Sequence, residues 1–406
     1  MNYWQLLKQY PAFLMFGFMA TFASSFGQTF FISLFVDDIT QLHDLSYGQF
    51  GSLYAITTAV GGLFLMRVGK KLDYIPLKHF AHFVILGLAL SAALMALSAN
   101  WVVLIIAMFG LRLFGQGLMG HMAVTSMGRY FNELRGRAVA FSGIGFPAGE
   151  IVLPGLALLL LSQLGFITTW WLITGVIIIA FWPLLIALQA HHPKVSLSKK
   201  SDDATEIPAP AMLRQRDIIR DKSFLGVLPA MLALPFVMTG ILINQLWFAE
   251  QRGWSLDVIA VGIALFSISR VITSVIAGSW VDKLGSFKLI GVNILPVAVG
   301  LIALTFVEAF WGWYTFMLLG GFSAGFNSAI SGTLWPEIYG TRSLGTIRAL
   351  YHSLMIFATA AAPMLFGYLI DLGVPLSWWL LTTVGALILA WICARLAVSG
   401  LSHKRL

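Results

Sequence analysis

The sequence predicts an all-α membrane protein whose twelve transmembrane helices form two six-helix bundles. Three observations lead to this prediction: the 406 residues are 59% hydrophobic and only 10% charged, they contain twelve separate apolar stretches, and one long polar segment lies between the sixth and the seventh. A soluble domain usually carries about 25% charged residues, and a bilayer-crossing helix needs about 20 apolar ones. Ordinary soluble enzymes, disordered chains and fibrous proteins are therefore excluded.

The apolar stretches give the expected order of the spans along the chain. They cover residues 11–36, 47–69, 79–98, 101–125, 138–162, 168–189, 223–249, 257–280, 288–307, 311–334, 346–370 and 377–398. The polar segment at 190–222 is rich in proline, lysine and arginine, which predicts a solvated linker. We therefore expect one bundle over 1–189, the linker over 190–222 and a second bundle over 223–406.

Membrane topology explains the net charge of +8 without a nucleic-acid partner. Of the 25 lysines and arginines, all except Arg112, Arg252 and Arg270 fall in or beside segments on one side of the predicted membrane. Such a bias marks the cytoplasmic side, where basic groups also contact anionic lipids. We expect both termini and the linker to be cytoplasmic, in a bacterial inner membrane.

The residues that catalysis or metal binding would need are scarce. The single cysteine, Cys393, excludes an intrachain disulfide and a cysteine metal cluster. No cluster of histidine, aspartate or serine suited to catalysis falls near one membrane face of the predicted topology. We therefore expect neither enzyme activity nor a cofactor, and no resident metal site.

The two halves of the chain repeat one another at a nearly constant offset. Matching residues lie 208 or 209 positions apart: Gly69 with Gly278, Asp73 with Asp282, Phe114 with Phe322, Gly117 with Gly325, Gly136 with Gly345 and Pro154 with Pro363. The pattern indicates tandem duplication of a six-helix unit. Parallel repeats of this kind place a substrate site at mid-membrane between the halves and expose it alternately to each side.

Two loops contain the most specific motif in the chain. The loop after the second span is GKKLDYIPLK (69–78), and the loop after the eighth is GSWVDKLGSFK (278–288). Both resemble the G-x-x-x-D-[RK]-x-G-x-[RK] signature of the major facilitator superfamily, although Tyr74 and Pro76 depart from it in the first copy. The segment RLFGQG (112–117) is similar to the R-x-x-x-G-x-G element of that family. The resemblance implies a twelve-helix secondary transporter.

The signature loops are expected to control conformation. In each loop the glycine lets a helix end approach its neighbour, and the aspartate caps the following turn. The resemblance therefore implies that Gly69 and Asp73, with their repeats Gly278 and Asp282, act as conformational latches rather than substrate ligands.

Three ionised side chains lie deep within the predicted spans: Arg112, Glu150 and Arg270. Burial of a charge in hydrocarbon is costly, so each is functional by default. The resemblance gives Arg112 a place in a polar network that couples protonation to motion, with substrate contact or a structural role as alternatives. Glu150 favours its neutral form when desolvated, which suits a proton carrier. A static ion pair is the alternative for Glu150.

Arg270 is predicted to recognise an anion. Ser267 and Ser274 fall on its helical face at i−3 and i+4, and a guanidinium beside hydroxyl groups suits a carboxylate. The superfamily branch that carries oxalate, formate and monocarboxylates binds its substrate with an arginine in this span. The resemblance to that branch rests on the arginine alone, because Phe266 replaces the acidic residue that monocarboxylate carriers place four positions earlier.

Glu150 and Arg270 are expected to lie at similar depth. They stand 14 and 12 residues from the cytoplasmic markers Gly136 and Asp282, and a helix rises 1.5 Å per residue. The resemblance packs the fifth span against the eighth. We therefore expect the two side chains to approach each other in one state of the protein.

Uncharged polar residues supply further candidate sites. The resemblance implies that the first, fourth, seventh and tenth helices line the cavity, and the candidate substrate contacts besides the arginines are Ser24, Gln28, Asn244, Trp247, Ser323 and Asn327. Helix–helix hydrogen bonding is the alternative for each. His352, toward the cytoplasmic end of its span, is a candidate for proton coupling or a packing histidine.

These features favour a secondary transporter for a small organic anion of the carboxylate class, coupled to protons or to a counter-anion. We expect it to act as a monomer. The first alternative is an efflux antiporter for amphipathic drugs or siderophore-like compounds, suggested by the glycine-rich fifth span. Less favoured alternatives are a copper transporter and a sensor that has the same fold but does not transport.

The predicted orientation is tested by labelling a cysteine in the linker. In a Cys393→Ser background, Ser201→Cys should resist membrane-impermeant thiol reagents in intact cells and react after the cells are broken open. Labelling of this cysteine from outside intact cells would contradict the assignment.

Overall fold

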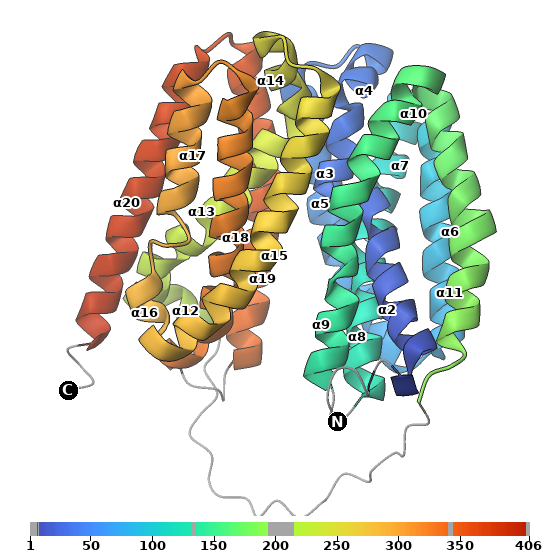
Figure 1. Cartoon of the computed structure of the whole chain (residues 1–406), viewed down its shortest axis with the longest axis horizontal. Coiled ribbons are helices and arrows are strands. Elements are labelled where there is room, and N and C mark those ends of the chain that lie inside the picture. Colours follow the sequence, from blue (N-terminus) through green and yellow to red (C-terminus); the bar gives the residue numbers. More distant parts are fainter. Residues whose placement is uncertain (1–5, 7, 132–134, 194–214, 340–343, 403–406) are drawn as a thin grey trace, which may run out of the picture.

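The computed structural model describes residues 6, 8–131, 135–193, 215–339 and 344–402. Within these ranges the chain is almost entirely helical and contains no β-strand. The helices form two bundles that stand side by side (Figure 1). The predicted fold class, an all-α membrane protein, is confirmed.

The helices of the first half begin at local capping signals. They are α2 (Pro11–Ala23), η1 (Ser24–Gly27), α3 (Thr29–Ile32), η2 (Ser33–Phe35), α4 (Val36–His43), α5 (Tyr47–Val68), η3 (Gly69–Asp73), α6 (Leu77–Ala96), α7 (Trp101–Gly110), η4 (Leu111–Met119), α8 (Gly120–Tyr130), α9 (Arg135–Gly143), α10 (Gly145–Val176), η5 (Ile177–Phe181) and α11 (Trp182–Gln189). Ser46 and Gln49 form a capping box at the start of α5, and Asn100 caps α7.

The second half repeats this plan with fewer breaks. Its elements are α12 (Gln215–Arg220), α13 (Lys222–Ile243), α14 (Gln245–Arg252), α15 (Leu256–Leu284), α16 (Ser286–Leu289), α17 (Leu295–Phe306), α18 (Phe310–Tyr339), α19 (Leu344–Asp371) and α20 (Leu376–Ser402). Asp221 caps α13 by accepting the Ser223 N–H at 2.8 Å.

The helix lengths are consistent with twelve crossings. Among the described residues, eight helices are long and apolar enough to cross a membrane, and the bent pair Pro11–Gly27 and Thr29–His43 makes a ninth. One of the eight, Arg137–Gln189, contains 53 residues and changes direction at Gly165, so it comprises two membrane-spanning segments. Gly165 has φ 73°, a value that glycine adopts without steric cost. The shorter apolar helix α17 and the long helix α18 complete the predicted order.

Both ends of each bundle can be named from the chain path. We call the end where α11 finishes and α12 begins the linker end, and the opposite end the far end (Figure 1). Because α2 starts and α20 finishes at the linker end as well, each half crosses the molecule an even number of times. This is the arrangement that parallel repeats require.

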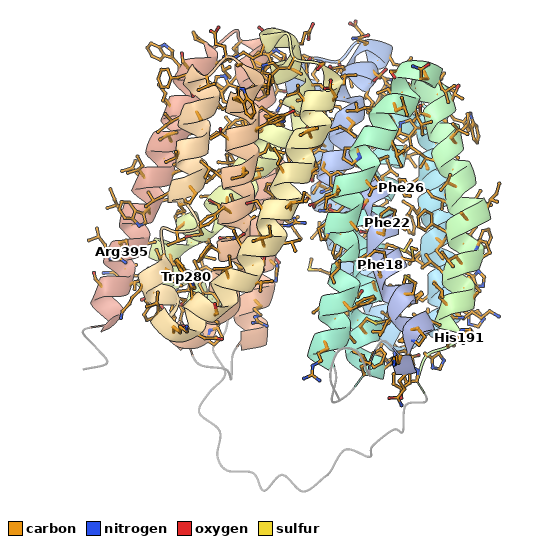
Figure 2. The ribbon with its side chains drawn as sticks, in the orientation of Figure 1. Phe18, Phe22, Phe26, His191, Trp280 and Arg395 are labelled. Atoms are coloured by element: carbon orange, nitrogen blue, oxygen red, sulfur yellow. The ribbon has the colours of Figure 1, made fainter. Side chains whose placement is uncertain are left out.

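A row of aromatic rings holds the first span against the sixth. Phe18, Phe22 and Phe26 lie one helical turn apart along α2 and η1 (Figure 2). The Phe181 ring of η5 lies 6.1 Å from Phe22 and 5.9 Å from Phe26, measured between centroids. Apolar side chains gain no hydrophobic advantage over lipid tails, so close packing of this kind supplies the cohesion within a bundle.

The two bundles meet mainly along two helix pairs, α5 with α19 and α10 with α15. Glycines bring the first pair together: a Cβ atom on Gly51 would collide with the Pro363 carbonyl, and one on Gly367 would collide with the Tyr47 carbonyl. Small residues permit such backbone contact between membrane helices. The α5–α19 interface is therefore tightly closed toward the far end.

An aspartate of one bundle caps a helix of the other. The Asp371 carboxylate accepts hydrogen bonds from the Ser46 hydroxyl at 2.6 Å, the Tyr47 N–H at 3.1 Å and the Gly48 N–H at 2.8 Å. These backbone donors open α5 and have no partner within the helix, and a negative charge also favours the positive helix end. Asp371 thus joins the bundles at the far end.

Removal of this cap should loosen the far end. Loss of an N-cap costs about 1 kcal/mol, so Asp371→Ala should raise about fivefold the population in which α5 and α19 separate at the far end. Ser52 lies in α5 beside Tyr368 of α19, so the rate at which a thiol reagent labels Ser52→Cys should rise by the same factor. The measurement uses purified protein in a Cys393→Ser background. Asp257→Ala is the matched control, since Asp257 lies in the first turn of α15. Equal labelling rates in the two variants would show that the cap does not hold the interface.

Candidate functional site

A cavity of about 880 Å³ lies between the bundles. Its walls come from α9, α10, α13, α15, α18 and α19, and mainly from the parts of these helices nearer the linker end. Glu150 and Arg270 are the charged residues among its described lining, and the remaining walls are mostly apolar. Ligand sites are typically apolar cavities with a few convergent polar groups, so this cavity is the candidate binding site.

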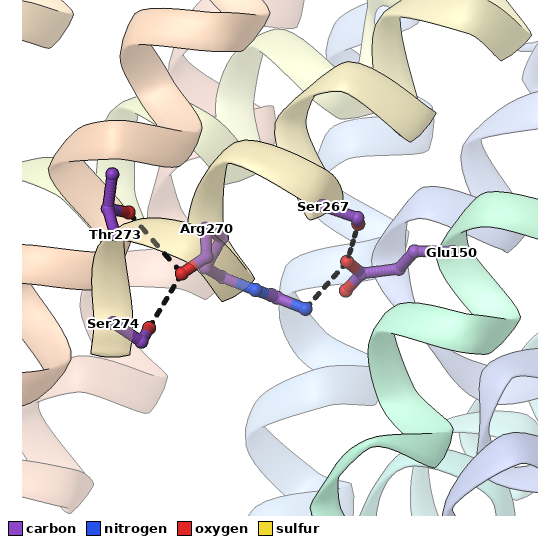
Figure 3. A network of polar contacts seen from close by, with 5 residues as sticks. All are labelled: Glu150, Ser267, Arg270, Thr273 and Ser274. Carbon is purple, nitrogen blue, oxygen red and sulfur yellow. Dashed lines mark hydrogen bonds and ion pairs between the residues drawn. The ribbon is translucent and has the colours of Figure 1, made fainter. Parts of the chain in front are cut away.

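Glu150 and Arg270 form an ion pair across the bundle interface. The Arg270 Nη2 atom lies 2.7 Å from Glu150 Oε2 (Figure 3). The predicted approach of these two side chains is confirmed. Their side chains are 13% and 27% exposed respectively, so both remain accessible from the cavity. The Ser267 hydroxyl also donates to Glu150 Oε2.

The hydroxyl groups near Arg270 differ from the sequence-based expectation. Ser267 and Ser274 were expected to stand beside the guanidinium as part of an anion receptor, but Ser267 binds Glu150 instead. The Ser274 hydroxyl donates to the backbone carbonyl of Arg270 at 2.7 Å (Figure 3), as helical serines often do. Ser267 and Arg270 therefore bind the same Glu150 oxygen, and neither serine hydroxyl bonds the guanidinium itself.

The Arg270 guanidinium has spare donors. Only Nη2 is engaged by Glu150, and Nε and Nη1 make no hydrogen bond with any described residue. The guanidinium carbon lies 5.4 Å from the centroid of the Phe266 ring, which is within the range of a cation–π interaction. A guanidinium has five N–H donors in a fork that matches a carboxylate. Arg270 can therefore bind an anion while Glu150 is still close.

Glycines place Glu150 at the cavity. A Cβ atom on Gly145 would collide with the Thr21 side chain, and one on Gly149 would collide with the Ser25 hydroxyl. These glycines bring α10 against the first span and present Glu150 on the opposite side, toward α15. Close helix packing therefore accounts for Gly145 and Gly149 of the glycine-rich fifth span, whereas Gly143 and Gly155 have open space at the Cβ position.

Arg112 is buried behind the cavity and does not line it. Its Nε donates to the Thr58 hydroxyl and its Nη1 to the Gly27 carbonyl, both at 3.0 Å. The guanidinium carbon also lies 4.8 Å from the Tyr54 ring centroid. No carboxylate pairs with Arg112 among the described residues, so neutral groups of two helical segments, α5 and η1, hold its charge.

Gln28 and Asn327 are the two uncharged candidates that line the cavity. Asn327 accepts a hydrogen bond from Asn293 at 3.0 Å, whereas the Gln28 amide has no partner among the described residues. Gln28 owes its position to a break in the first span, where it is extended with ψ 155°.

Five other predicted site residues lie away from the cavity lining. Ser24 donates to the Thr21 carbonyl, Asn244 to the Gly240 carbonyl, and Ser323 accepts the Val297 N–H. Trp247 packs edge-on against Phe248, and His352 is an exposed residue of α19 beside Tyr351. Only the Ser323 bond joins two helices, α17 and α18, as the alternative of helix–helix hydrogen bonding expects; the Ser24 and Asn244 bonds are local, to carbonyls three and four residues earlier.

The first signature loop is tied to the fourth span. His121 hydrogen-bonds the Gly69 carbonyl at 3.3 Å, and Arg129 donates to the Leu72 carbonyl at 3.0 Å. The side chain of Asp73 lies outside the described residues. These contacts fix the end of the second span whatever the conformation of that aspartate.

The second signature loop is held by different residues. Asp282 is exposed and makes no hydrogen bond with a described residue, and Gly278 has open space around its Cα. The loop is anchored by Glu337, which accepts the Ser286 N–H at 3.1 Å and its hydroxyl at 2.6 Å. The latch roles of these loops therefore stay predictions.

Comparison with known proteins agrees with this architecture. The family profile of the Major Facilitator Superfamily matches residues 15–351 and, in a second match, residues 230–404. The chain belongs to the major facilitator superfamily. It is a membrane transporter rather than an enzyme, and its structure is consistent with alternating access.

Two solved structures of a bacterial homologue of the human lysosomal transporter Spinster are similar in fold. The inward-facing, unoccupied form has a TM-score of 0.71 and 16% identity, covering 97% of this chain and 98% of that one. The inward-facing, occupied form has a TM-score of 0.67 and 14% identity, covering 96% of both. No curated protein matches the sequence. At this identity the likeness describes the fold alone.

Several polar contacts were not identified from the sequence. Asp371, Glu337 and Ser267 all bind partners in distant segments, and no repeat or motif indicates those partners. Asp371 gave one usable signal, because it is an acidic residue at the end of a predicted span. Its partners are backbone N–H groups of α5, which no sequence pattern identifies.

Replacement of Arg112 should destabilise the first bundle. Lysine is a point charge and cannot bind Thr58 and Gly27 together as the guanidinium fork does. Arg112→Lys should lose at least one charge-assisted hydrogen bond, about 1.5–3 kcal/mol, and lower the melting temperature in detergent. Arg395→Lys, at an exposed position of α20, should melt like the parent protein. An unchanged melting temperature for Arg112→Lys would refute the bridging role.

Proposed function

We propose that this transporter carries a small organic anion of the carboxylate class and couples its movement to a proton. The observation that carries the proposal is the Glu150–Arg270 pair, whose arginine faces the central cavity with unused donors. A guanidinium in a largely apolar cavity is a strong receptor for a carboxylate. Each charge in such a cavity needs a partner. Binding of the anion to Arg270 and protonation of Glu150 would therefore depend on each other.

The proposed cycle begins when a carboxylate binds the free Nε and Nη1 donors of Arg270. It then competes with Glu150 for the guanidinium. Glu150 would lose its counter-charge and retain only the Ser267 hydroxyl. A buried carboxylate without a counter-ion is strongly disfavoured, so Glu150 would take up a proton. The bundles would then rock with both charges neutralised.

The closed far end and the cavity near the linker end support an inward-facing state under the proposed topology. In that topology, both termini and the linker are cytoplasmic, in a bacterial inner membrane. Asp371 and the α5–α19 glycines would close the outer side, and substrate would reach Arg270 from the cytoplasmic side. The ion pair lies in a single chain, so a monomer suffices for the proposed site.

Export of amphipathic compounds is the second candidate function. The cavity volume of about 880 Å³ and its phenylalanine, proline and methionine walls favour it. An efflux pump of this kind would bind by apolar contact and would depend little on Arg270. The two functions therefore differ in their response to one substitution.

The test compares three variants in proteoliposomes with an imposed pH gradient. Arg270→Ala should abolish carboxylate binding and uptake. Glu150→Gln should still bind the anion but lose the dependence of uptake on the pH gradient. Arg348→Ala removes an equal charge from an exposed part of α19 and should behave like the parent protein.

The outcomes separate coupling from a permanent structural pair. Removal of one partner of a structural pair leaves an uncompensated charge and costs about 3–5 kcal/mol. Failure of Glu150→Gln to fold, with Arg270→Ala equally unstable, would identify the pair as structural. Carboxylate uptake by Arg270→Ala at the parent rate would overturn anion recognition, and undiminished transport of lipophilic compounds by this variant would support efflux.

A further inference from the structure

A second, smaller cavity lies beyond the ion pair. It has a volume of about 160 Å³. Six residues line both it and the large cavity: Gln28, Glu150, Pro235, Met238, Phe266 and Arg270. The ion pair is thus the partition between two compartments, and a ligand held by Arg270 has access to both.

This smaller cavity, which we call the inner chamber, lies nearer the far end. On α13 it is lined by Thr239 and Leu242, which follow the Leu234 of the large cavity by one to two turns toward the far end. On α15 it is lined by Ile263, two turns from Arg270 in the same direction. The large cavity, by contrast, lies along the linker side of the pair.

We propose that the inner chamber is a subsite for the carbon chain of the substrate, and that it selects anions with one carboxylate and a short chain. The inference rests on the proposed function, because the carboxylate of the same molecule is held by Arg270. It adds a site and a substrate class that anion recognition by Arg270 does not itself imply.

The charge distribution of the inner chamber supports a single carboxylate. Apart from the ion pair, its described lining carries no charged side chain, and its walls include Phe30, Leu242 and Ile263. A second carboxylate in this space would be removed from water without a cation to pair with it, which is costly. A methylene chain would instead gain from burial there.

Two polar residues allow the inner chamber to bind a small uncharged polar group on the carbon chain of the substrate. Thr239 and Gln28 line it, and neither the Thr239 hydroxyl nor the Gln28 amide has a hydrogen-bond partner among the described residues, whereas Thr29 is already bonded to the Tyr54 hydroxyl at 2.7 Å. A hydroxyl or oxo group on the chain could bind them. Ionised groups could not, since neither residue supplies a charge.

The volume sets a limit on chain length. At about 30 Å³ for each water-sized group, 160 Å³ holds roughly five carbon-sized groups. Affinity should therefore rise along a series of straight-chain monocarboxylates and then fall once the chain exceeds the chamber. Pentanoate is expected near the optimum, because its carboxylate carbon beside Arg270 and its four chain carbons make five such groups.

The experiment measures binding of acetate, propanoate, butanoate, pentanoate, hexanoate and octanoate to the detergent-solubilised full chain, by ligand-dependent thermal stabilisation. Each methylene up to pentanoate should tighten binding about fourfold, which corresponds to about 0.8 kcal/mol. Octanoate should bind more weakly than pentanoate. Glutarate, which has the same chain length as pentanoate and a second carboxylate, should bind at least tenfold more weakly.

Two leucines of α13 provide matched variants. Leu242→Ala enlarges the inner chamber and should shift the optimum to a longer chain, while Leu242→Phe should shift it to a shorter one. Leu234→Ala changes only the large cavity and should leave the optimum in place. If Leu242→Ala does not fold, Leu242→Val enlarges the inner chamber less and should also shift the optimum to a longer chain.

The possible results distinguish this inference from the proposed function. If carboxylates bind through Arg270 but with equal affinity at all chain lengths, or if glutarate equals pentanoate, the inner subsite is refuted and anion recognition stands. An optimum that moves with Leu234→Ala instead of Leu242→Ala would also refute it. If no carboxylate binds the parent protein, the proposed function and the inner subsite both fail.

Discussion

A charge or polar group inside a membrane protein must find a partner within the protein, because hydrocarbon offers none. Apolar side chains gain no hydrophobic advantage over lipid tails, so the halves are joined by the close glycine packing of α5 against α19 and by a small number of polar contacts. Glu150 with Arg270 joins α10 to α15, and Asp371 with the start of α5 joins α19 to the other bundle. The arrangement of the two bundles follows from where these contacts are placed.

The sequence repeat relates these two interfaces, yet each has its own chemistry. Glu150 corresponds to Thr359 of α19, and Arg270 corresponds to Gly61 of α5. One interface therefore contains an ion pair beside a cavity, and the other contains glycines in backbone contact. The duplicated halves thus form one tight interface, α5–α19, and one open interface, α10–α15. The open interface can bind a ligand while the tight interface keeps the halves together.

The break in the first span links the buried arginine to the cavity. Where the helix is interrupted at Gln28, backbone groups lose their helical partners and need others. Arg112 binds the Gly27 carbonyl at this point, and the next residue, Gln28, is extended and lines both compartments. Arg112 is therefore connected to the cavity through the backbone of the first span, although it does not line the cavity itself.

The sequence by itself determined the membrane class, the order of the helices, the duplication and the depth of Glu150 and Arg270. These follow from hydropathy, repeat spacing and helical rise, which are local or periodic properties of the chain. Tertiary structure alone decided which polar groups face the cavity. Ser24, Asn244 and Ser323 have the composition of ligand contacts, but each satisfies a backbone group of its own bundle. Asp371 binds backbone N–H groups more than 320 residues away. Such choices depend on the rotation of each helix about its axis and on distant backbone donors, and neither leaves a pattern in the sequence.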